Sequence, residues 1–327
     1  MGIQIVRYRK SRKISWGVLA EENIIPISNE AENLSDFLVD GVQEAREKLV
    51  KEDSEKVLLE EVELLSPVTN PTNIVCQGVN YSMHRKETGM SSSRPPYNMI
   101  FGKAPSSISG PFDAIVKPEH VQLLDYEIEL GLVIGKEINE QTVITDENIS
   151  DYIAGLVITN DVSARDVQLT ELQWLKGKSY RTFCPVGPYL YILDEDEVNE
   201  IYNLELLLTV NGEVRQSANT DQLLYKPVET LNELAQTMDL TVGDLVLTGT
   251  PGGVAMQLST EELNCLTSLT ASPEEKTKVI QRQFEIGQYL KVGDVIEASI
   301  ASPDGKIQLG KQRSVVKELQ LVQNNSI

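Results

Sequence analysis

Residues 124–135 read LDYEIELGLVIG, and this stretch decides the fold. Acidic and aromatic residues lead into an apolar run closed by glycine, which predicts one strand over the whole stretch. Glu127 and Glu129 are two residues apart, so they lie on the same face of that strand. On a solvent face the two carboxylates would only repel each other. In a cavity they would need a shared proton or a cation, and Mg²⁺ or Mn²⁺ suits oxygen ligands.

The composition is that of an acidic globular protein. The chain has 327 residues, with 29 basic against 49 acidic side chains and a formal net charge of −20. This charge disfavours nucleic acid and anionic membranes as partners, although most of it is explained by a solvated acidic surface. Cys76, Cys184 and Cys265 are too widely spaced for a disulfide framework or a zinc site, which predicts a cytoplasmic protein. The sequence contains no run of membrane-spanning length.

Two domains are predicted. Residues 1–70 read as a small N-terminal unit with short strands and an amphipathic helix over 33–57. Prolines and an asparagine at 67–71 punctuate the chain, and residues 71–327 form the larger domain. Within it, two capping patterns predict a helical segment over 256–287.

A histidine and a glutamate follow a predicted strand over 73–81. His84 and Glu87 are three residues apart and share a face on one turn of helix. A carboxylate beside an imidazole can orient it and raise its basicity, as a general base that activates water requires. The alternative is a plain surface pair of an exposed helix.

Two lysines lie in segments that read as loops. Residues 90–120 are rich in serine, proline and glycine, which predicts either a lid over substrate or a long surface connection. Lys103 in this segment could reach an anionic substrate. Lys178 opens the loop-rich stretch 177–188 and could polarise a substrate carbonyl, or it could be an ordinary solvated lysine.

The next predicted strand, 153–161, ends on another carboxylate. Asp161 could supply a third oxygen ligand, or it could cap a helix over 162–168. Arg165 and Gln168 share a face of that helix, so Arg165 could clamp a substrate carboxylate or instead form a surface ion pair.

A glycine-rich turn follows a strand that begins near residue 241. It includes Thr250, and its small residues allow a backbone to approach a ligand and to offer N–H donors. An ordinary tight turn is the alternative.

Taken in order, these pieces resemble the fumarylacetoacetate hydrolase family from about residue 73 to the C-terminus. No single motif decides the matter, but six occur in the family's order. They are GVNYSMHRKE (78–87), DYEIEL (125–130), NDVSARDVQ (160–168), GKS (177–179), VNGEVRQ (210–216) and GDLVLTGTP (243–251).

The resemblance implies an α+β fold, a mixed β-sheet roll with a small N-terminal α/β domain, and a homodimer. It implies Mg²⁺ or Mn²⁺ at the three carboxylates, a base pair on a mobile lid, and contacts to a small 2-oxo acid. The chain departs from the family at 256–287, where the helical segment is an insertion, and in its ending at 306–310. The residues carried over are Glu127, Glu129 and Asp161 for the metal, His84 and Glu87 for the base, and Lys178, Arg165 and Gln168 for the substrate.

The resulting expectation is a hydrolase that cleaves a C–C bond in a 2,4-dioxo acid of the acylpyruvate or fumarylpyruvate type. The metal and Lys178 would stabilise the developing enolate charge. Decarboxylation or tautomerisation of oxaloacetate or a related acid is the alternative on the same site. A non-enzymatic metal-binding protein is the alternative of another class, and it predicts that His84 and Glu87 are dispensable.

Overall fold

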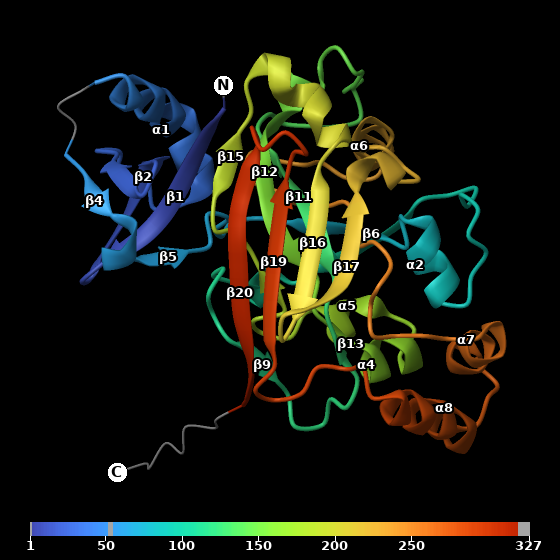
Figure 1. Ribbon diagram of the computed structural model, residues 1–327. Coiled ribbons are helices and arrows are strands. Elements are labelled where there is room, and N and C mark those ends of the chain that lie inside the picture. Colours follow the sequence, from blue (N-terminus) through green and yellow to red (C-terminus); the bar gives the residue numbers. More distant parts are fainter. Residues whose placement is uncertain (1, 52–54, 320–327) are drawn as a thin grey trace, which may run out of the picture.

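The computed structural model describes residues 2–51 and 55–319, and a large sheet runs through them (Figure 1). Most neighbouring strands are antiparallel, but β18 and β6 are parallel, so the sheet is mixed as predicted. Its strands are, in spatial order, β4 (Val57–Leu58), β3 (Asn23–Pro26), β2 (Lys13–Ala20), β1 (Ile3–Lys10), β15 (Leu190–Ile192), β12 (Ile153–Asn160), β11 (Ile128–Ile134), β18 (Leu245–Leu247), β6 (Ile74–Gly78) and β7 (Met99–Lys103), with β5 (Glu63–Leu65) paired to β1.

A second, five-stranded sheet packs on one face of the first, in front of β11 and β12 in Figure 1. Apolar side chains alternate along its strands, so Leu206 and Leu208 point into a core shared with Leu130 and Leu156 of the large sheet. The two packed sheets confirm the α+β class. The strands are β17 (Glu213–Asn219), β16 (Glu205–Val210), β19 (Val295–Ala301), β20 (Gln308–Glu318) and β9 (Ile115–Lys117).

The predicted strand over 124–135 is interrupted. Its first residues form the short strand β10 (Leu124–Asp125), which pairs with β13 (Ser163–Ala164), and β11 begins only at Ile128. The chain turns because the buried Asp125 carboxylate accepts hydrogen bonds from the backbone N–H groups of residues 126, 255 and 256. The N–H of Glu127 donates to the Asn160 side chain instead of to a neighbouring strand. Beyond this point β11 is buried on both faces.

The N-terminal region continues the large sheet. Strand β1 pairs with β15, and Ile5 is fully buried in a core that also holds Val133 and Val157. Helix α1 (Leu34–Leu49) packs against β2 and β3. It ends earlier than the predicted 33–57, and Val50 beyond it is 81% exposed, while residues 52–54 of that prediction lie outside the described residues. The division at residue 70 remains a prediction, and this sheet and core connect the two sides of it.

The remaining helices lie mostly at the edges of the sheets. The capping boxes predicted within 256–287 are confirmed, since Ser259 and Ser272 cap two successive helices. Among the described residues, none of the helices combines the length and apolarity needed to cross a bilayer. The helices are α2 (Ser82–Glu87), α3 (Ile149–Tyr152), α4 (Arg165–Thr170), α5 (Trp174–Lys178), α6 (Pro227–Ala235), α7 (Thr260–Thr267) and α8 (Pro273–Ile286), with 3-10 turns at Leu59–Glu61, Pro105–Ser107, Glu195–Tyr202 and Thr220–Gln222.

Two local predictions and one alternative are wrong. The loop predicted over 90–120 contains β7, β8 (Ile108–Ser109) and β9, because serine- and proline-rich flanks obscured their short apolar runs. Lys178 ends helix α5 instead of opening a loop. Asp161 does not cap a helix, since β13 intervenes and Ala164 occupies the N-cap of α4.

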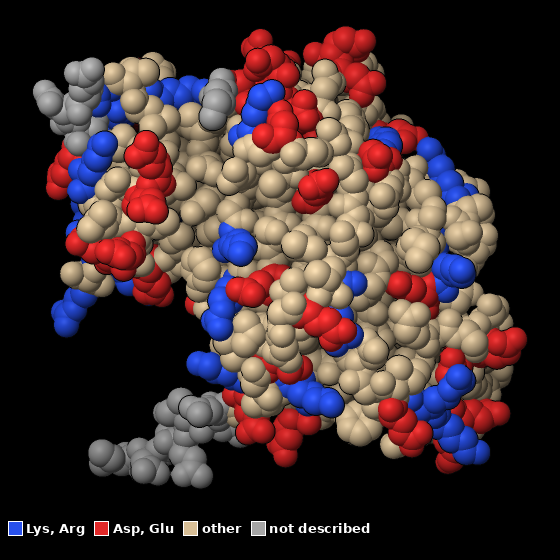
Figure 2. Space-filling model, viewed as in Figure 1, with Lys and Arg blue, Asp and Glu red and all other residues tan. Residues whose placement is uncertain are grey.

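The surface viewed in Figure 2 carries acidic and basic side chains intermingled around its margin, while a broad zone over β16 and β19 holds few charges.

Candidate metal centre and active site

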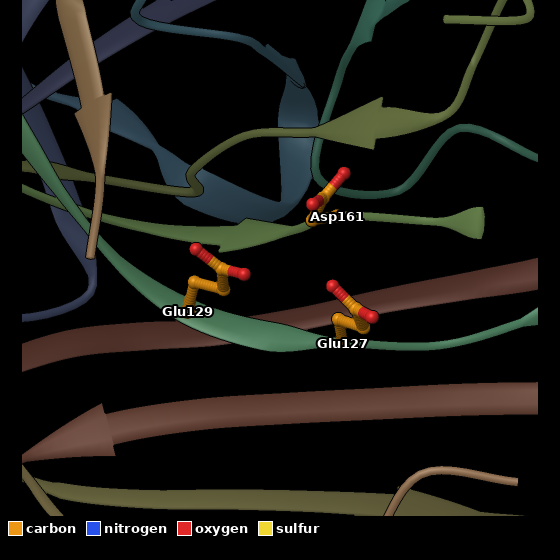
Figure 3. A group of neighbouring side chains, drawn as sticks. All are labelled: Glu127, Glu129 and Asp161. Carbon is orange, nitrogen blue, oxygen red and sulfur yellow. The ribbon is translucent and has the colours of Figure 1, made fainter. Parts of the chain in front are cut away.

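Three buried carboxylates meet where β11 begins and β12 ends. Glu129 lies on β11, Glu127 directly precedes this strand, and Asp161 directly follows β12. Because Ile128 pairs with Asn160, the antiparallel register brings these three positions together. Figure 3 shows their side chains pointing toward one another, and one oxygen of each lies within 4.8 Å of the others. The expected grouping of the three carboxylates is present.

Two lysines balance part of the carboxylate charge. The Lys178 Nζ lies 2.6 Å from a carboxylate oxygen of Glu127 and 2.6 Å from one of Asp161. The Lys103 Nζ lies 2.5 Å from the other oxygen of Asp161 and also contacts the Lys178 carbonyl. All of these side chains are almost completely buried, so the ion pairs are shielded from water.

The third carboxylate, Glu129, forms no ion pair with a lysine or arginine among the described residues. One oxygen of Glu129 accepts a hydrogen bond of 2.7 Å from the Gly249 N–H. Its other oxygen is buried and has no hydrogen-bond partner in the part of the chain that the structure describes. Burial, together with the charges of Asp161 and Glu127, raises the pKa of Glu129 well above its usual range. An unpartnered buried oxygen among three carboxylates fits a divalent cation with oxygen ligands.

Arg165 is held by side chains on both sides. Its Nε lies 2.9 Å from Asp125, its Nη2 lies 2.5 Å from Glu127, and its Nη1 donates to the Gln168 amide oxygen at 3.0 Å. Burial raises the pKa of Glu127, but the charges of Arg165 and Lys178 outweigh it and hold that pKa below its usual value. Arg165 and Gln168 share a face of α4, as the sequence predicts.

The predicted base pair lies on the short helix α2. His84 is buried, and its Nδ1 lies 3.8 Å from a Glu87 oxygen. This nitrogen has no hydrogen-bond partner among the residues that the structure describes. The Glu87 carboxylate instead accepts the Gly253 N–H at 2.8 and 3.0 Å. The two side chains are therefore adjacent, and Glu87 also ties α2 to the glycine-rich turn that follows β18.

These groups surround a cavity of about 90 Å³. His84, Glu127 and Glu129 line it together with Arg165, Gln168, Lys178 and Thr250. The Thr250 hydroxyl donates to the Ile128 carbonyl and accepts from the Gln216 amide. Lys103 is not among the lining residues. Its ammonium group is fully buried and pairs with Asp161.

Some residues of the site carried no prediction. Asp125 orients Arg165, and its place two residues before Glu127 was the signal that could have found it. Leu172, Trp174 and Leu263 line the cavity, but an apolar residue carries no signal in the sequence that separates a cavity wall from a core.

Known proteins share both the sequence and the fold of this chain. Oxaloacetate tautomerase FAHD2A of Bos taurus, named as mitochondrial, is 42% identical over 198 residues, which cover 60% of this chain and 61% of the relative. The matched part of this chain thus covers about three fifths of that relative's length.

Solved structures match almost the whole chain. A probable 2-hydroxyhepta-2,4-diene-1,7-dioate isomerase from Mycobacterium abscessus superimposes with a TM-score of 0.73 at 30% identity, covering 98% of this chain and 100% of the other. Maleylpyruvate hydrolase from Sphingobium sp. SYK-6, solved with manganese(II) and pyruvate, gives a TM-score of 0.71 at 26% identity, covering 97% and 100%.

The family model for the fumarylacetoacetate (FAA) hydrolase C-terminal domain matches residues 73–317, which is most of the chain. The match begins at β6 and ends within β20, so it contains every carboxylate, lysine and histidine of the site described above. The chain belongs to the fumarylacetoacetate hydrolase family.

Proposed function

We propose that the protein is a divalent-metal-dependent hydrolase that cleaves a C–C bond in a small 2,4-dioxo acid. The observation that carries the proposal is the placement of His84 in the same cavity as Glu127 and Glu129. A general base and a metal centre then face one small substrate. The unpartnered oxygen of Glu129 supports a cation, and a structural neighbour that holds manganese(II) and pyruvate supports Mg²⁺ or Mn²⁺ with a 2-oxo acid.

Glu127, Glu129 and Asp161 would hold the metal, which supplies Lewis-acid stabilisation of negative charge on the substrate oxygens. Arg165 and Gln168 orient the substrate carboxylate, and Thr250 borders its site. Lys178 places a positive charge where the enolate develops. Lys103 acts through Asp161, whose orientation it fixes.

In the reaction, His84 removes a proton from water while Glu87 orients the imidazole. The water oxygen bonds to the C4 carbonyl carbon, and the C3–C4 bond then breaks. The electron pair of that bond passes to C3 and is delocalised as an enolate. A proton returns to C3, which gives pyruvate and a carboxylic acid.

Tautomerisation of oxaloacetate is the second candidate, because a relative with 42% identity is named for that activity. It needs a proton to move between C3 and the 2-oxo oxygen, which His84 and Lys178 are placed to assist, and it needs no attacking water. Decarboxylation of oxaloacetate uses the same stabilised enolate.

The location and assembly of the protein are also proposals. The zone over β16 and β19 that holds few charges supports a homodimer, because the centre of a dimer interface is depleted in charged residues (Figure 2). The predicted cytoplasmic location stays a prediction, and the relative named above is a mitochondrial protein.

The decisive experiment measures turnover of acetylpyruvate, fumarylpyruvate and oxaloacetate with Mg²⁺, with Mn²⁺ and with EDTA. His84→Ala and Glu127→Ala are compared with wild type and with His120→Ala, which removes the other histidine of the chain from an exposed position. Cleavage that requires metal, His84 and Glu127 supports the hydrolase. Keto–enol conversion of oxaloacetate without any acylpyruvate cleavage supports the tautomerase. Metal binding without turnover supports the non-enzymatic alternative.

A further inference from the structure

The cavity has a charged end and an apolar end. Glu127 and Glu129 are almost completely buried, whereas four apolar side chains that also line the cavity are half-buried and so lie nearer to solvent. They come from three separate segments. We call them the apolar mouth, and they are Met90, Leu172, Trp174 and Leu263.

The apolar mouth is built by specific packing. Trp174 packs edge-on against Phe101 with ring centroids 5.1 Å apart, and it fills the space beside Gly78, where a Cβ would lie 2.7 Å from the indole ring. Leu172 has φ of +63°, in the left-handed region that is unfavourable for a branched side chain. Such a backbone conformation persists only where the surrounding structure stabilises it, and the residue that adopts it here lines the cavity.

Leu263 reaches the cavity from α7, within the helical segment that lengthens the chain after the glycine-rich turn. This segment is anchored to α2, since the Leu258 N–H donates to the Glu87 carbonyl and the Thr260 hydroxyl donates to the Gly89 carbonyl. Thr267 of the same helix also lines the cavity and adds a hydroxyl but no charge. The wall is therefore fixed to the helix that carries His84.

The described residues that line the cavity include no unpaired lysine or arginine. Among the described residues that line the cavity, Arg165 and Lys178 are the only arginine and lysine. Both are already paired, Arg165 with Asp125 and Glu127, and Lys178 with Glu127 and Asp161. A second carboxylate on a substrate would lose its hydration at this end and could gain the Thr267 hydroxyl but no unpaired lysine or arginine, whereas an alkyl group gains from burial.

We infer that the enzyme selects 2-oxo acids whose distal substituent is short, uncharged and apolar, and that Leu172, Trp174 and Leu263 determine this specificity. The inference rests on the proposed function, because the 2-oxo acid group must occupy the charged end of the cavity. Monocarboxylic acylpyruvates are then preferred over fumarylpyruvate and over oxaloacetate.

Binding to the Mn²⁺-loaded full-length protein tests this inference without turnover. 2-Oxopentanoate and 2-oxoglutarate have the same number of carbon atoms and differ in a terminal methyl or carboxylate. By isothermal titration calorimetry we expect 2-oxopentanoate to bind at least about tenfold more tightly. Along the series pyruvate, 2-oxobutyrate and 2-oxopentanoate, affinity should rise about fourfold per methylene. Equal or tighter binding of 2-oxoglutarate overturns the inference, as does the absence of binding by both acids.

Variants at the mouth sharpen the test. Leu263→Arg should reverse the preference toward 2-oxoglutarate, while Leu269→Arg, at a position 87% exposed in the same helical segment, should leave it unchanged. Leu263→Ala is the milder variant, and it should weaken 2-oxopentanoate severalfold without changing pyruvate binding. An unaltered preference in both Leu263 variants overturns the assignment of this residue. If the binding preference is found but no acylpyruvate is cleaved, the proposed reaction fails and the inference stands.

Discussion

At the scale of single residues, Lys178 balances the charge of the carboxylate cluster. It bonds to two of the three carboxylates, and the attraction of Asp161 and Glu127 raises its pKa even though burial opposes this. Lys178→Met would leave both carboxylates buried without this partner. We expect a loss of about 3–5 kcal/mol in the free energy of unfolding of the metal-free protein. Mn²⁺ should restore part of it, because the cation replaces the lost charge.

Thermal unfolding with EDTA and with Mn²⁺ measures this loss. The matched control is Lys176→Met, two residues away, whose side chain is 61% exposed and pairs with Glu171 at the surface. This control should change stability by less than about 0.5 kcal/mol. A Lys178→Met protein as stable as the control would contradict the charge balance described here.

The raised pKa of Glu129 leads to a prediction of how metal affinity depends on pH. Its pKa is raised by burial and by the charges of Asp161 and Glu127, so the metal-free folded protein holds a proton that the unfolded chain has already lost. Stability of the metal-free protein therefore falls as pH rises from the unfolded pKa toward the raised one. A divalent cation must displace this proton.

We thus expect Mn²⁺ affinity to rise with pH by up to about tenfold per unit until the raised pKa is passed, and then to level off. Calorimetry in two buffers of different ionisation enthalpy counts the proton released. In Glu129→Gln both the affinity and its pH dependence should be lost. A pH-independent affinity in the wild type would show that Glu129 is already ionised without metal.

The residues of the site were predictable to different degrees. The spacing of Glu127 and Glu129, and the carboxylate of Asp161 at a strand end, are local features that the sequence displays. The partners of Lys103 and Lys178 are not local, because each bonds to a residue from another segment. No spacing in the chain encodes such pairs, and only the folded sheet brings them together.

At the scale of elements, the contact between α2 and the start of α7 holds the base in place. Gly89 ends this contact with φ of +78°, and a Cβ there would lie 2.8 Å from the Ser259 carbonyl oxygen. Gly89→Ala should therefore push α2 away from the helical segment and lower kcat about tenfold or more, since displacement of about 1 Å costs an enzyme much of its rate.

Gly212→Ala is the matched control, because Gly212 also has positive φ, at +81°, but no atom lies within 4 Å of the added Cβ. Both variants should lose about 1 kcal/mol of stability from backbone strain. Kinetics of acylpyruvate cleavage then separates them. Equal kcat values for the two variants would show that the contact does not position His84.

Prediction of the elements failed where polar contacts interrupt a pattern. Residues 124–135 have the composition of one strand, but the hydrogen bonds of Asp125 divide it into β10 and β11. The donors to Asp125 include residues 255 and 256, some 130 positions away. Long-range hydrogen bonds of this kind override local strand propensity. The helix starts at Ser259 and Ser272 were predictable because capping is local.

At the scale of the whole molecule, the pairing of β1 with β15 joins segments nearly 190 residues apart. The large sheet therefore contains strands from both sides of the boundary predicted near residue 70. The shared sheet and core lead us to expect that residues 2–70 and the rest of the chain unfold together. The two tryptophans allow a direct test, because Trp16 lies in the N-terminal region, stacked on Phe37, and Trp174 lies at the cavity.

In Trp174→Phe, fluorescence reports only Trp16, whereas circular dichroism reports the whole chain. We expect both signals to change at the same urea concentration, as a single cooperative unit requires. Ile5→Ala, which opens space in the shared core, should lower the free energy of unfolding by about 2–5 kcal/mol and shift the urea midpoints of both signals equally. If the Trp16 signal changed first and Ile5→Ala moved only that transition, residues 1–70 would be an independent domain, and the continuous sheet would contribute little coupling.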